Sequence, residues 1–135
     1  MSTNLEIITD ALRAINVLDE TETASAEQGV YCLRQLNQML AAWEVDDIAL
    51  GYFAQTSTAV TCPIPDWAEV GVTNKLGIRV SSQYAAQVPP GIAFSAEEGY
   101  QTILRTTINM KLKGLDMTHM AMGLGQTATY DITLG

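Results

Sequence analysis

The segment from Ser25 to Asp46 constrains the fold most strongly, because it combines a helix start signal with a regular apolar stripe. Ser25 followed three residues later by Gln28 is a capping-box pattern, in which each side chain bonds the backbone N–H of the other residue. Beyond it, apolar residues at three- and four-residue spacing fall on one helical face: Gly29, Leu33, Leu36, Leu40 and Trp43. The segment is therefore predicted to be the central helix, with this stripe in the core.

Three further helices are predicted around the central one, over about residues 3–18, 65–86 and 95–114. Ser2 or Thr3 caps the first, and Pro65 suits the start of the next because a first helical turn leaves its N–H without a partner. The last opens with a second capping box, Ser95 and Glu98, after the Pro-Pro break that ends the preceding helix. Its predicted buried face comprises Ala96, Gly99, Tyr100, Ile103, Thr107 and Met110.

Two segments lack helical periodicity. Residues 47–65 are rich in Thr, Val and aromatic residues, which favours a short β-hairpin with strands near 50–54 and 59–62. Residues 115–135 begin Met- and Gly-rich and then alternate apolar with polar residues, placing Tyr130, Ile132 and Leu134 on one face of a strand. The predicted fold is mainly α: a bundle of about four helices in residues 1–114, with a β-hairpin excursion and an extended C-terminal arm.

The predicted third helix carries apolar residues on two sides. Val72, Leu76 and Val80 form one stripe, nearly opposite a second stripe made by Trp67, Val70, Gly71, Ile78 and Ala85. Such a helix is either sandwiched within the bundle or shared between the monomer core and a second subunit, and the pattern favours neither. The working hypothesis is that Val72, Leu76 and Val80 form a subunit interface.

Charge and cysteine content exclude several classes of protein. Fifteen acidic residues against seven basic ones give a formal charge of −8, which argues against tight binding of DNA phosphates. Cys32 and Cys62 form no CxxC motif and no pair with histidine, so free thiols in a reducing compartment and no metal site are expected. The sequence also lacks a long apolar run or signal-peptide pattern, so no membrane contact is expected.

Side chains that could carry out catalysis are few. His119 is the only histidine and lies in a Met- and Gly-rich stretch, where a fixed catalytic pair is not expected. Glu44, Asp46 and Asp47 could pair carboxylates for acid–base chemistry, although acidic residues at a helix end are more commonly solvated. No catalytic residue and no cofactor site are therefore predicted.

Two short packing motifs carry a family resemblance. These are Leu36-Asn37-x-x-Leu40-x-x-Trp43 in the central helix and Pro65-Asp66-Trp67 after the predicted strands. Together with the ALRAINVL first helix, the Pro-Pro break and the SAEEGY helix start, they resemble the head-to-tail adaptor proteins of tailed phages over roughly residues 5–113. The branch they resemble is the podovirus tail accessory factor, also called the packaged-DNA stabilisation or head-completion protein.

This resemblance implies a structural function with no enzymatic activity. Such adaptors form a ring, typically of twelve copies, below the portal, where they extend the DNA channel and provide a platform for tail assembly. The implied partners are other copies of the chain, the portal protein and a downstream tail or nozzle protein, while DNA passes without tight binding. The implied location is the head-to-tail junction of the virion, after synthesis in the cytoplasm of the host bacterium.

Docking on the portal or on an adjacent subunit is assigned to Tyr130, Ile132 and Leu134, whose alternating strand has no obvious partner nearby in sequence. Two other functions remain open from the residues alone, a small phage hydrolase acting on the cell wall and a small cytoplasmic protein-binding regulator. A mass measurement with and without a portal ring separates them, since only an adaptor should shift to a large complex.

Overall fold

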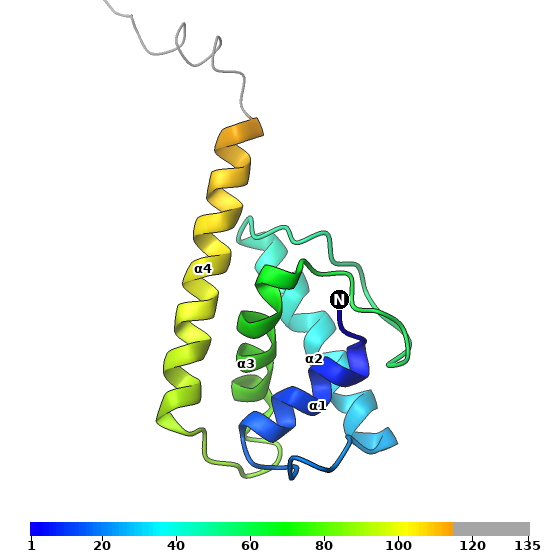
Figure 1. Ribbon diagram of the computed structural model, residues 1–135. Coiled ribbons are helices and arrows are strands. Elements are labelled where there is room, and N and C mark those ends of the chain that lie inside the picture. Colours follow the sequence, from blue (N-terminus) through cyan, green and yellow to red (C-terminus); the bar gives the residue numbers. More distant parts are fainter. Residues whose placement is uncertain (115–135) are drawn as a thin grey trace, which may run out of the picture.

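The structure is a computed structural model that describes residues 1–114, and within that range the chain forms four α-helices. They are α1 (Asn4–Ala14), α2 (Ala26–Val45), α3 (Glu69–Val80) and α4 (Pro90–Gly114), with a short 3-10 turn, η1 (Asp66–Ala68), leading into α3. Figure 1 shows α3 between α4 on one side and α1 and α2 on the other, and α3 packs against all three. The mainly helical prediction is confirmed, while the predicted C-terminal arm lies outside the described residues.

Local side-chain signals fix the start of the first two helices. Ser25 and Gln28 form both bonds of the capping box, at 2.9 Å from Ser25 N to Gln28 Oε1 and 3.2 Å from Gln28 N to Ser25 Oγ. Thr3 and Glu6 form the same pair at the start of α1, with distances of 2.7 and 3.1 Å. The central helix therefore begins and ends within one residue of its predicted limits.

The two later helices differ from their predicted limits. α3 ends at Val80 rather than Ala86, and the turn that follows includes Ala85 in the left-handed region, with φ of 51°. α4 begins at Pro90, because proline suits the first helical position and the Pro89 carbonyl accepts bonds from the N–H groups of Ile92 and Ala93. Ser95 therefore lies inside the helix, and the predicted second capping box is wrong.

The predicted β-hairpin is also wrong, since no β-strand occurs within residues 1–114. The segment before η1 is irregular, with one isolated bridge between Thr3 and Thr61. Its backbone instead bonds elements distant in sequence: Asn37 in α2 holds both the N–H and the carbonyl of Gln55, each at 2.9 Å. The Val60 carbonyl accepts a 2.9 Å bond from Asn4 N at the start of α1. These bonds replace the ladder of a hairpin.

The core lies where α1, α2 and α3 meet. Apart from Ile103 in α4, the largest fully buried side chains belong to these helices and their flanking segments, and they include Ile7, Ile8, Leu12, Leu36, Ile64 and Leu76. α4 joins this core mainly through α3, against which it crosses closely at Gly71 and Gly99. Because a long helix is attached along one side, much of its surface stays uncovered.

The two thiols in this core predict a pH dependence of stability. Burial is the main cause that raises the pKa of Cys32 to about 11 and of Cys62 to about 12, from an ordinary value of 9.0. This stabilisation is complete below the unfolded pKa and is lost as pH rises towards the folded values, because the unfolded chain ionises first. At pH 10 the loss should be roughly 1 kcal/mol per thiol.

Urea unfolding at pH 8 and pH 10 checks this expectation. The matched control is the double variant Cys32→Ala, Cys62→Ala, which keeps the tyrosines and lacks both thiols. The loss of unfolding free energy between the two pH values should be smaller in the double variant than in the unmodified protein. Equal losses in both would show that the thiols do not contribute.

Candidate interaction surface

The structure places the three residues of the predicted subunit interface in the core of the single chain. Val72, Leu76 and Val80 are each 0% exposed and belong to the same apolar cluster as the residues of α1 and α2. The prediction that they face a second subunit is therefore wrong, because the chain's own helices cover them. The sequence left two interpretations of this helix open. For this stripe, the structure agrees with the one in which α3 is packed inside the bundle of its own chain.

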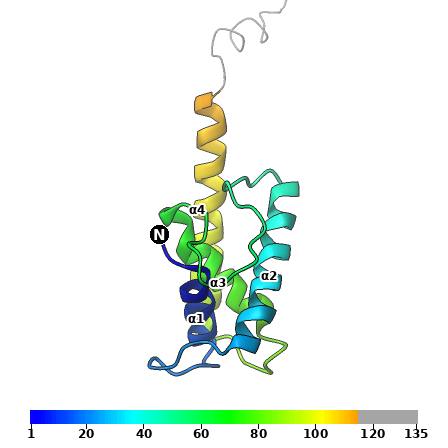
Figure 2. The same ribbon diagram turned by 90° about the vertical axis from the view of Figure 1, so that its right-hand side faces the viewer.

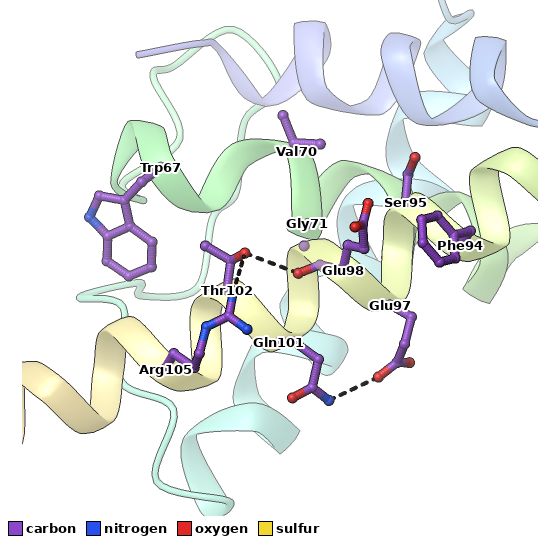
Figure 3. A pocket seen from close by; sticks show the side chains of 11 residues that line it. Trp67, Val70, Gly71, Phe94, Ser95, Glu97, Glu98, Gln101, Thr102 and Arg105 are labelled. Carbon is purple, nitrogen blue, oxygen red and sulfur yellow. Dashed lines mark hydrogen bonds between the residues drawn. The ribbon is translucent and has the colours of Figure 1, made fainter.

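The opposite side of α3 provides the exposed apolar surface. Val70 is 65% exposed and Trp67, in η1, is 37% exposed, and both belong to the second apolar stripe that the sequence analysis identified. They form one wall of a groove of about 560 Å³, and α4 forms the other wall. Figure 3 shows Phe94 at one end of the groove and Trp67 facing Arg105 at the other. We call this the α3–α4 groove.

Polar side chains line the α4 wall of the groove. Thr102 Oγ1 donates to the Glu98 carbonyl at 3.0 Å and accepts from Arg105 Nη2 at 3.4 Å (Figure 3). Glu97 accepts from Gln101 Nε2 at 3.0 Å and pairs with Lys75 Nζ at 3.3 Å, and these two partners lower the pKa of its carboxyl. The groove thus has apolar side chains at its two ends and polar side chains along the α4 wall.

The far end of α4 forms a second exposed surface. Ile108, Met110 and Leu112 are exposed there, so the prediction that Met110 is buried is wrong. The physical reason is that α4 extends past the other helices (Figure 1), so these apolar side chains of its last turns stay uncovered in the described chain. Between Gly99 and Gly114 the helix carries Arg105, Lys111 and Lys113 and no acidic residue. Three of the seven basic residues are thus gathered on α4.

A third exposed surface lies on the segment from Ile48 to Pro65, which contains no charged residue. Its exposed large apolar side chains are Phe53, at 66%, and Val60. In Figures 1 and 2 this segment runs over α1 and α2, on the side of the molecule away from α4. We call it the uncharged segment.

The side chains considered for catalysis do not form a site in the part of the chain that the structure describes. Glu44, Asp46 and Asp47 are exposed at the end of α2, and Asp47 pairs with Lys111 at 3.6 Å. Among residues 1–114, no three His, Cys, Asp or Glu side chains are arranged to hold a metal ion. His119 lies outside the described residues, as do Tyr130, Ile132 and Leu134. None of the described helices is long and apolar enough to cross a membrane.

The described fold is a small helical domain with large apolar side chains exposed on several surfaces, a feature common in proteins that bind other proteins. The family model described as P22 tail accessory factor matches residues 1–133, and the chain belongs to this family. The resemblance noted in the sequence is thereby confirmed. A comparison with curated proteins found no match. Family membership assigns the chain a structural, tail-related role in a phage and favours a non-enzymatic function.

Proposed function

We propose that this protein is a head-to-tail connector adaptor of the virion, which forms a ring below the portal. The observation that carries the proposal, together with the family match, is the surface of α4. This helix has 25 residues, yet its buried described residues are Ala96, Ile103 and Thr107. A long helix held along one side and bearing exposed apolar residues is suited to packing against neighbouring subunits.

The proposal extends to the ring and its channel. Twelve copies is the number typical of such adaptors, and a ring of that kind extends the DNA channel and offers a platform to the tail or nozzle protein. The net charge of −8 supports passage of DNA without tight binding, because acidic surfaces repel phosphates. We assign the basic end of α4 to protein contacts and not to DNA, because the exposed apolar side chains of Ile108 and Leu112 lie beside its basic residues.

Contact with the portal is proposed for the C-terminal arm, through Tyr130, Ile132 and Leu134. The support is the alternating apolar pattern of residues 128–134, which suits strand addition to a sheet edge on another molecule. α4 leads directly into this arm and carries the chain away from the helical body (Figure 1), so the arm starts from the most projecting point of the described fold.

Mass measurement with and without portal rings tests this function. The full chain should move into a complex that contains many copies per ring, while a chain cut after Gly114, where α4 ends, should keep its helical content and lose the attachment. No change in mass for the full chain would contradict the adaptor function. Cell-wall hydrolysis by the purified protein would then favour a phage hydrolase, and capture of a different host protein would favour a regulator.

A further inference from the structure

We infer that the α3–α4 groove receives the uncharged segment of a neighbouring copy, with Phe53 and Val60 packing against Trp67 and Val70. The inference rests on the proposed ring function and names the surfaces through which copies meet. It makes the contact heterologous, since one copy offers the groove and the next copy offers the segment.

The two surfaces are formed by different elements of the chain. The groove is lined by η1, α3 and α4, whereas the backbone of the uncharged segment runs over α1 and α2 (Figures 1 and 2). In a closed ring, each subunit offers one surface to the neighbour on one side and a different surface to the neighbour on the other side. A groove and an apolar segment on one face of the molecule would instead give a closed dimer.

The distribution of charge favours the uncharged segment as the part of a second copy that enters the groove. Copies of a protein with charge −8 repel one another, and an uncharged surface adds nothing to that repulsion. The segment from Ile48 to Pro65 contains no charged residue. Of the charged side chains that line the groove, Glu97 pairs with Lys75 beside it, and Arg105 adds a positive charge to the same wall as Glu98. By contrast, the turn between α1 and α2 carries Asp19, Glu20 and Glu22 and no basic residue.

The segment is also held in place before it meets a partner. Asn37 binds both backbone groups of Gln55, and Gln55 Nε2 donates to the Phe53 carbonyl at 2.8 Å. Val60 is fixed through its carbonyl by Asn4 N. Hydrogen bonds therefore hold the backbone beside both exposed apolar side chains in place. Less conformational entropy is then lost when the segment binds.

Disulfide cross-linking between copies tests the inference and preserves all four apolar side chains. Ala54→Cys, beside Phe53, and Ser95→Cys, in the groove wall, are purified separately, mixed and oxidised, both free and bound to portal rings. The native thiols are buried and should not interfere. We expect the mixture to give heterodimers at least tenfold faster than a control mixture of Thr21→Cys with Ser95→Cys. Adding Phe53→Asp to the Ala54→Cys chain should reduce cross-linking to the control rate.

The possible outcomes separate this inference from the proposed function. A mixture that cross-links no faster than the control, with and without portal rings, overturns the inference. So does a faster cross-link of Ser95→Cys with itself, which would indicate a symmetric dimer through the groove. If the full chain still shifts in mass with portal rings, only the assignment of surfaces fails. If the selective cross-link forms without any portal association, the contact stands and the adaptor function fails.

Discussion

Replacing Leu76 with Glu should unfold the protein, whereas the same substitution at Val70, six residues earlier on α3, should leave it folded. Leu76 is fully buried among α1, α2 and α3. Removing a buried leucine side chain costs roughly 2–5 kcal/mol, and a carboxylate without a partner adds a further penalty or takes up a proton. Because typical domains have only about 5–15 kcal/mol of stability, this loss is a large share of the total.

The Val70 variant is the matched control, because it introduces the same carboxylate on the same helix at a side chain that is 65% exposed. Far-ultraviolet circular dichroism and urea unfolding of both variants check the expectation. A folded Leu76→Glu monomer would contradict the placement of this stripe in the core and would restore the subunit interface that the sequence suggested. The folded Val70→Glu variant should also lose the contact between copies, since its charge lies in the α3–α4 groove.

Elements specified by neighbouring residues were predictable from the sequence. The start of α2 needs only Ser25 and Gln28, and its buried face needs only helical spacing, so both were predicted correctly. The uncharged segment was misassigned because its Thr, Val and aromatic residues favour strands, while the groups that hold it are Asn37 and the start of α1. Partners so distant in sequence leave no periodic pattern.

The candidate interaction surface shows the same limit. Helical spacing identifies two apolar stripes on α3 but cannot decide which one the rest of the chain covers. That choice depends on where the neighbouring helices pack: α4 crosses α3 at Gly71, and the side chain of the preceding residue, Val70, remains 65% exposed. Met110 was misassigned for a related reason. Helical spacing places it on the same face as the buried residues of α4, but it does not reveal that α4 extends beyond the neighbouring helices. The absence of charge between Ile48 and Pro65 was visible in the sequence and was the available signal for the third surface.

Replacing Gly99 with Ala should destabilise the protein, although alanine is ordinarily the better helix former. A Cβ atom at Gly99 would lie 2.6 Å from the Gly71 Cα and 3.0 Å from the Gly71 N. These are backbone atoms of α3, so no side chain can move aside, and the two helices must separate. Such overpacking costs roughly 1–3 kcal/mol, which outweighs the roughly 0.5–1 kcal/mol that replacing a helical glycine with alanine gains.

Gly91 on the same helix provides the control, because a Cβ there would meet nothing within 4 Å. Gly91→Ala should therefore leave the unfolding free energy unchanged or raise it slightly, and urea unfolding of both variants measures the difference. Separation of the helices should also disturb the edge-on contact of Trp43 with Tyr100, whose ring centres lie 5.2 Å apart, and so change the near-ultraviolet circular dichroism. A Gly99→Ala variant as stable as Gly91→Ala would contradict the close crossing. Since α4 is attached mainly through this crossing and forms one wall of the α3–α4 groove, the same variant should also weaken contact between copies.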